Sequence, residues 1–254
     1  MRRRRPTAEG GRRLSRPRRR GWGVAWALAG FGLLPGLARL AVALAGDPES
    51  TGDYDTASVV AVVFHVVGGT LYAVLGAFQF PTALRRERRA WHRRAGRLLV
   101  PLGLSAALSG LWLSFFFPRL HHSGALLGVI RFTFGTAMVV SLVIAYVAIR
   151  RRDIARHRQW MIRAYALGLG VATQIFTQGF GEPLVGSGET SIALLIGLGW
   201  VINLAVAETV IRRGPLRPRR RTDGLVPAQV RRHAAAEGTG APTGAAPRVA
   251  DEAP

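Results

Sequence analysis

Residues 151–170 read RRDIARHRQWMIRAYALGLG, and within this stretch an arginine cluster passes directly into an apolar run. The same change recurs along the whole chain of 254 residues, in which all 35 basic residues are arginine and 49% of residues are hydrophobic. A soluble basic protein mixes charged and apolar residues throughout, whereas this chain separates them. Because a helix that crosses a bilayer needs roughly 20 mostly apolar residues, the pattern predicts an all-α integral membrane protein.

Six apolar runs are long enough to cross a bilayer. They comprise residues 22–46, 57–80, 97–117, 124–149, 160–180 and 190–211. We therefore predict a bundle of six transmembrane helices within residues 21–213. An arginine-rich arm (1–20) precedes it, and a tail rich in Pro, Arg, Ala and Gly (214–254) follows it. Neither segment can bury enough apolar area to offset its ordering entropy, so we expect both to be disordered.

The arginines cluster on alternate connections between these runs. Residues 1–20 hold ten arginines, residues 85–97 hold seven, residues 150–163 hold six, and nine follow Ile211. The intervening loop GDPESTGDYDT (46–56) carries four acidic residues and no basic one. The positive-inside rule therefore predicts a cytoplasmic-membrane protein with both termini in the cytoplasm. Because the net charge of +21 lies mainly at helix ends and in the tails, it indicates anionic lipid headgroups as partners and no nucleic acid.

Two internal hairpins share a pattern of polar residues. His65 precedes His92 by 27 residues, and Arg131 precedes His157 by 26 residues. In each hairpin an intramembrane polar residue is thus followed by a His-Arg pair at the inner edge. The pattern suggests that the second to fifth helices form a four-helix core from two repeated hairpins, flanked by the first and sixth helices.

Three sequence elements resemble a known family. They are His65 and Gly69 with the following GAFQF (76–80), HRRAGRL (92–98), and RDIARHRQWMIRAYAL (152–167). Over about residues 57–180 the chain resembles a bacterial multi-pass membrane family catalogued as domain of unknown function 2306, and the HRxWMxR element is the most specific part. The resemblance implies a membrane location and a shared helical core. It implies no activity, because none is established for the family.

His92 and His157 lie at the predicted inner edge, one on each hairpin. Two histidines at equal depth on neighbouring helices can ligate a b-type haem from opposite faces, which would support transmembrane electron transfer. In di-haem cytochromes with a four-helix core the ligands lie within the spans, whereas these two lie at or outside the boundary. An interfacial belt of Arg, His and Trp that binds headgroups explains them as well, and a role in proton or ligand binding is a third interpretation.

Four polar residues share one predicted depth near the outer side, about 6–8 residues or roughly 9–12 Å from the outer end of their spans. They are Arg39, His65, Arg131 and Gln174. An intramembrane arginine costs of order 2.5–3.5 kcal/mol, so such residues usually face the bundle interior or water. They predict an outward-open polar cavity for an anionic or acceptor-rich molecule, such as a carboxylate, a quinone, a lipid headgroup or a haem propionate. Alternatively, the arginines reach the interface or pair with Glu182 or Glu189.

The sequence offers no catalytic residue and no metal ligand apart from the two candidate haem histidines. It contains no cysteine, which excludes disulfides, thiolate metal sites and cysteine nucleophiles, and it shows no catalytic triad, phosphate loop or metalloprotease pattern. Arg163 and Glu208, both near the inner edge, predict a structural ion pair. Two hypotheses of function stay open: electron transfer through b-type haem, and non-enzymatic binding or transport of an anionic ligand.

Overall fold

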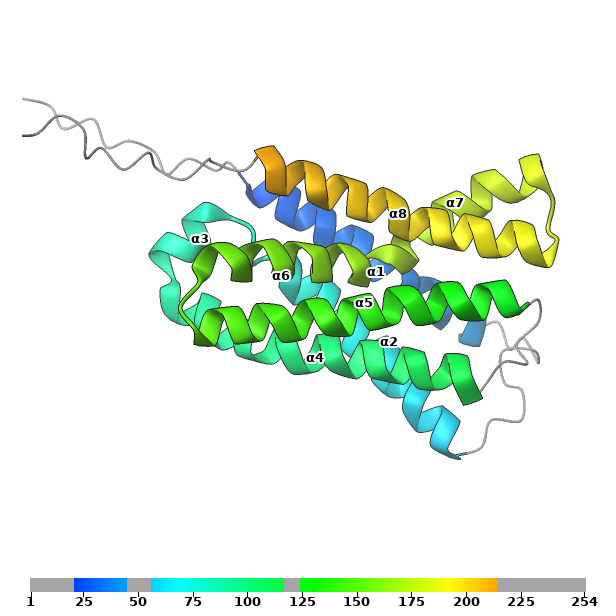
Figure 1. Cartoon of the computed structure of the whole chain (residues 1–254), viewed down its shortest axis with the longest axis horizontal. Coiled ribbons are helices and arrows are strands. Elements are labelled where there is room, and N and C mark those ends of the chain that lie inside the picture. Colours follow the sequence, from blue (N-terminus) through cyan, green and yellow to red (C-terminus); the bar gives the residue numbers. More distant parts are fainter. Residues whose placement is uncertain (1–20, 45–55, 117–123, 214–254) are drawn as a thin grey trace, which may run out of the picture. The chain divides into compact units, whose positions relative to one another are not determined.

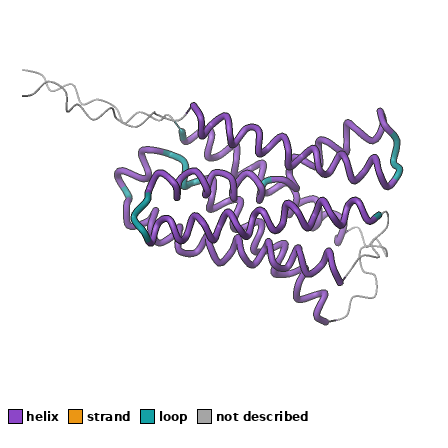
Figure 2. The backbone as a smooth tube through the Cα atoms, in the orientation of Figure 1, coloured by secondary structure: helices purple, strands orange, loops and turns teal. Residues whose placement is uncertain are grey.

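A computed structural model describes residues 21–44, 56–116 and 124–213, and every regular element in these ranges is an α-helix (Figure 1, Figure 2). The helices are α1 (Trp22–Leu44), α2 (Thr56–Ala77), α3 (Thr82–Glu87), α4 (Arg89–Phe116), α5 (Ala125–Arg150), α6 (Ile154–Gly168), α7 (Gly170–Val185) and α8 (Glu189–Arg213). The all-α prediction is confirmed. The predicted arm and tail lie outside the described residues.

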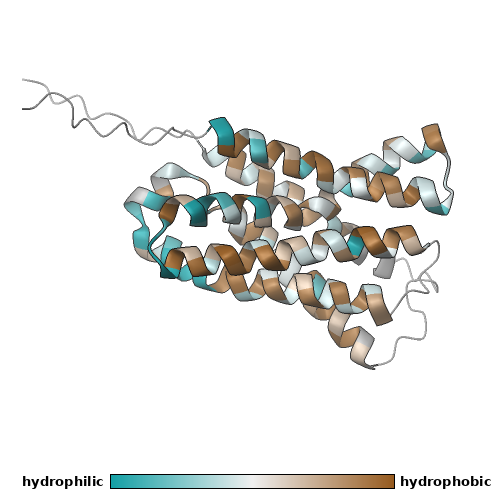
Figure 3. Cartoon of the chain, viewed as in Figure 1, coloured by the Kyte–Doolittle hydropathy of each residue, from teal (hydrophilic) through white to brown (hydrophobic). Residues whose placement is uncertain are grey.

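Four described helices are long and apolar enough to cross a membrane, namely α2 (from Val59), α4, α5 and α8. A shorter apolar helix covers Trp22–Ala38 in α1. Figure 3 shows hydrophobic residues along α4, α5 and α8, and hydrophilic residues around α3 and the start of α6. Large apolar side chains on the outer faces, such as Phe64, Phe115 and Val129, are more than half exposed, as lipid-facing residues are. The prediction of a membrane protein with several apolar helices is confirmed, and the count of six spans stays a prediction.

The fifth predicted span, residues 160–180, is divided into two helices. Helix α6 ends at Gly168 and α7 begins at Gly170, with a turn at Leu169 between them (Figure 1). Glycine is a poor helix former, about 1 kcal/mol less favourable than alanine, and here two glycines flank one residue. Together the two helices run from residue 154 to residue 185, so the structure extends the predicted segment at both ends and interrupts it in the middle.

Side chains of α8 bind the backbone carbonyls just before this interruption. Asn203 Nδ2 donates to the Ala166 carbonyl at 3.0 Å, and Trp200 Nε1 donates to the Leu167 carbonyl at 3.2 Å. Backbone groups inside a bilayer must find partners within the protein. The two side chains give these carbonyls partners outside their own helix and join α8 to α6.

Four helices contact one another in a ring. Helix α2 packs on α4, α4 on α5, α5 on α6, and α6 returns to α2, while α1 lies against α2 and α7. Tyr72, Leu99 and Leu142 are fully buried among these helices. The ring contains the second, third and fourth predicted helices and the first half of the fifth, so the predicted four-helix core stays a prediction. The relation of its two hairpins as a repeat stays a prediction.

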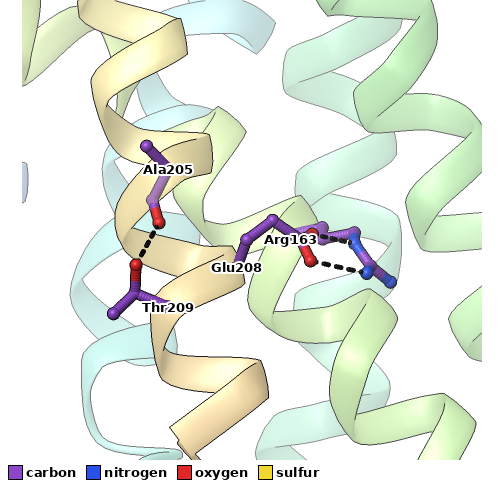
Figure 4. A network of polar contacts seen from close by, with 4 residues as sticks. All are labelled: Arg163, Ala205, Glu208 and Thr209. Carbon is purple, nitrogen blue, oxygen red and sulfur yellow. Dashed lines mark hydrogen bonds and ion pairs between the residues drawn. The ribbon is translucent and has the colours of Figure 1, made fainter.

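Helices α6 and α8 are also joined by the ion pair that the sequence predicts. Arg163 Nε donates to Glu208 Oε1 at 2.6 Å, and Arg163 Nη2 donates to Glu208 Oε2 at 3.1 Å (Figure 4). The Arg163 guanidinium also lies 4.8 Å from the centre of the Trp160 ring. A bidentate arginine–carboxylate pair fixes both position and orientation, so this pair sets the register of α8 against α6.

Candidate ligand-binding cavity

A cavity of about 440 Å³ lies among α1, α2, α4, α5 and the junction of α6 with α7. Most of its wall consists of small or apolar residues, including Gly36, Ala107 and Met138. Its polar side chains include His65, Thr70, Ser114, Arg131 and Gln174. Small-molecule sites usually have this form, a mostly apolar concavity with a few polar groups that fix the orientation of the ligand.

The His65 imidazole is oriented by the neighbouring helix. Its Nδ1 lies 2.8 Å from the Ala106 carbonyl oxygen of α4. Gly110, one turn further along α4, provides the space for the ring, since a Cβ there would lie 2.8 Å from His65 Cε1 and 3.0 Å from Nδ1. Sequence reasoning missed Gly110. A glycine inside an apolar run carries no sign of which side chain fills the space beside it.

Arg131 projects from α5 into the cavity wall and is partly buried. It lines the same cavity as His65. Within residues 21–44, 56–116 and 124–213, no hydrogen bond or ion pair reaches its guanidinium, and neither Glu182 nor Glu189 pairs with it. The alternative pairing that the sequence suggested is therefore not formed among the described residues.

Gln174 lies on α7, one turn beyond the interruption, and only 7% of it is exposed. Its Nε2 donates to the Ile196 carbonyl of α8 at 3.3 Å. Gly199 of α8 leaves room for it, because a Cβ there would lie 2.8 Å from Gln174 Cγ. The structure thus brings three of the four predicted outer residues to one cavity. The side chain of the fourth, Arg39, lies outside the described part of the structure, and ligand binding by the set stays a prediction.

The two inner histidines lie apart from this cavity, on α4 and α6. His157 Nδ1 is 2.9 Å from the Ala145 carbonyl oxygen, and His92 Nδ1 is buried with no partner among the described residues. In the described ranges, no group of three or more His, Cys, Asp or Glu residues could hold a metal ion.

The haem hypothesis for His92 and His157 therefore stays a prediction, and absorption spectroscopy tests it. If the two imidazoles ligate haem, the protein purified from haem-replete cells shows a Soret band that His92→Ala and His157→Ala both abolish. A colourless wild-type protein would contradict the hypothesis and leave the interfacial belt as the explanation of the RHR sequence at 156–158.

The apolar helices with lipid-facing surfaces, which enclose a mostly apolar cavity with a few polar groups, define a multi-pass helical membrane protein. A family described as predicted membrane protein (DUF2306) matches residues 62–211, and the chain belongs to this family. The match confirms the resemblance inferred from the sequence and continues beyond residue 180 into α8. No curated protein and no solved structure matches the chain. The family's description gives a location and no activity, so the functional argument rests on the cavity.

Proposed function

We propose that the protein binds an amphipathic anion in the cavity lined by His65, Arg131 and Gln174, and that it does so without catalysing a reaction. The observation that carries the proposal is the Arg131 guanidinium, which lies in a mostly apolar cavity with no partner among the described residues. Arg131 is partly buried, and a charge that is withdrawn from water is stabilised by a paired counter-charge. An anionic group of the ligand would supply the missing partner.

The remaining residues of the cavity wall indicate the chemistry of the rest of the ligand, to which the anionic group is attached. Residues such as Val62, Leu111, Phe134 and Leu167 offer apolar contacts and no charge. A small, strongly hydrated ion would gain nothing from such a surface, whereas an acyl chain or a ring would gain about 25 cal/mol for each Å² of apolar area removed from water. We therefore assign to the ligand an anionic head and an apolar body.

The same proposal includes the orientation of the protein in the cytoplasmic membrane. Arginines gather where α4 and α6 begin and where α5 and α8 end. The positive-inside rule would place that side in the cytoplasm. Arg131 lies near the start of α5, at the opposite end of the helix from Arg150, so the ligand would enter from the outer side.

Calorimetry on the full-length protein in lipid nanodiscs tests the proposal, with decanoate and the uncharged decanol as matched probes and empty nanodiscs as the blank. We expect decanoate to bind at least about tenfold more tightly than decanol, since one charge-assisted hydrogen bond contributes about 1.5–3 kcal/mol. Arg131→Gln should abolish this preference.

The matched control is Arg94→Gln, which removes an exposed arginine at the other end of the bundle. It should bind decanoate like the wild type. Equal binding of decanoate and decanol by the wild type would overturn the proposal, and so would an Arg131→Gln protein that keeps its wild-type thermal midpoint and its preference for decanoate.

A further inference from the structure

The hydrogen bond of His65 fixes which ring nitrogen carries the proton. The Ala106 carbonyl oxygen, 2.8 Å from Nδ1, can only accept a hydrogen bond. Nδ1 must therefore be protonated and donate. In the neutral imidazole the other nitrogen, Nε2, is then a bare acceptor.

This acceptor is available to a ligand. The hydrogen bond that the ring makes runs from Nδ1 to the Ala106 carbonyl, and no described residue donates to Nε2. The ring itself lines the cavity. The hydrogen bond to Ala106 and the close fit against Gly110 fix the ring, so Nε2 also has a defined position.

The neighbouring charge restricts what can donate to this atom. Arg131, which is positively charged, lines the same cavity as His65. A ligand ammonium group beside it would meet a like charge, and a protonated imidazole would meet the same repulsion. A neutral hydroxyl avoids both costs and donates one hydrogen bond.

Together, His65 Nε2 and the Arg131 guanidinium specify the ligand more closely than the charge of Arg131 does alone. We infer that the amphipathic anion carries a hydroxyl next to its anionic head, which donates to His65 Nε2 while the head binds Arg131. The inference rests on the proposed function and adds a specificity-determining role for His65. A carboxylate with a hydroxyl on the adjacent carbon is the simplest head that carries both groups.

The test compares decanoate with α-hydroxydecanoate on the full-length protein in nanodiscs. One neutral hydrogen bond corresponds to a gain in affinity of about tenfold. We expect α-hydroxydecanoate to bind about tenfold more tightly than decanoate to the wild type, and equally tightly to His65→Leu. Arg131→Gln should weaken the binding of both probes.

Nitrogen NMR supplies a readout on the protein with His65 unchanged. In protein labelled with ¹⁵N-histidine, the resonance of the unprotonated Nε2 of His65 should move when α-hydroxydecanoate is added and stay in place with decanoate. Because the chain has six histidines, the resonance is assigned by its displacement in Gly110→Ala, in which the added methyl disturbs the ring.

The failure of this inference differs from the failure of the proposed function. Equal affinity of the wild type for both acids, with both weakened in Arg131→Gln, would overturn the role of His65 and leave the anion site intact. Acid binding that does not depend on Arg131 would overturn the anion site as well.

Discussion

Gly170 begins α7 where the interrupted backbone meets the indole of Trp200. A methyl group at this position would lie 2.1 Å from Trp200 Nε1 and 2.2 Å from Cδ1, whereas carbon atoms in contact are separated by about 3.5–4.0 Å. In Gly170→Ala the indole must therefore move by more than about 1 Å. Such a movement breaks its 3.2 Å hydrogen bond to the Leu167 carbonyl and disturbs its stacking on Phe134, whose ring centre is 5.0 Å away.

The cost of Gly170→Ala follows from these contacts. Inserting a methyl into a packed site costs about 1–3 kcal/mol, and leaving a buried N–H without a partner costs about 1–3 kcal/mol. Alanine stabilises the helix by up to about 1 kcal/mol relative to glycine, because its helix propensity is higher. The two costs act at one site, so they need not add in full. Taking them together with the gain from alanine, we expect a net loss of about 3 kcal/mol in the free energy of unfolding.

Thermal unfolding of the purified protein, followed by intrinsic tryptophan fluorescence, measures this loss. A change of about 3 kcal/mol corresponds to a fall in Tm of about 6–12 °C for a chain of this size. Gly128→Ala is the matched control, because no atom lies within 4 Å of the added Cβ, and its Tm should be unchanged or higher. A wild-type Tm for Gly170→Ala, or an equal fall in both variants, would refute the steric argument.

Three further predictions concern the helical core and its orientation. Tyr72→Phe should raise the free energy of unfolding by about 1–3 kcal/mol, because the Tyr72 hydroxyl is buried without a partner among the described residues; a lower Tm would contradict this. Glu208→Ala should cost only about 1 kcal/mol, since the paired side chains are 24% and 36% exposed and solvent screens the pair; a double-mutant cycle with Arg163→Met measures the coupling. Reporters fused after Gly214 and within residues 50–55 should lie on opposite sides of the membrane, and an external C-terminus would contradict the six-span topology.

Helix ends at the membrane boundary were predictable because the composition changes there. The fourth predicted run, 124–149, differs by one residue at each end from α5 (Ala125–Arg150). By contrast, α4 begins at Arg89, about two turns before the predicted start at residue 97. Arginine and alanine are good helix formers, so the helix continues past the apolar run, which hydropathy alone cannot detect.

The interruption at Leu169 could not be predicted from hydropathy, because the residues on either side of it are as apolar as those of a continuous span. It depends on partners elsewhere in the chain, the side chains of Trp200 and Asn203. By contrast, polar groups of the cavity could be recognised from the sequence alone. Charge within an apolar run is costly wherever it faces lipid, so His65 and Arg131 could be assigned to the interior before any contact was known.

The contacts of the cavity's polar groups indicate which side chain would lose conformational freedom when a ligand binds. His65 is held by the Ala106 carbonyl and Gln174 by the Ile196 carbonyl, so both are positioned before a ligand enters. Arg131 alone among these three has no partner within the described residues. Ordering a long side chain on binding costs about 0.5–1.5 kcal/mol, and here only one side chain would bear that cost. Substitution of His65 should therefore change which ligand is preferred, whereas substitution of Arg131 should remove binding of the anionic head altogether.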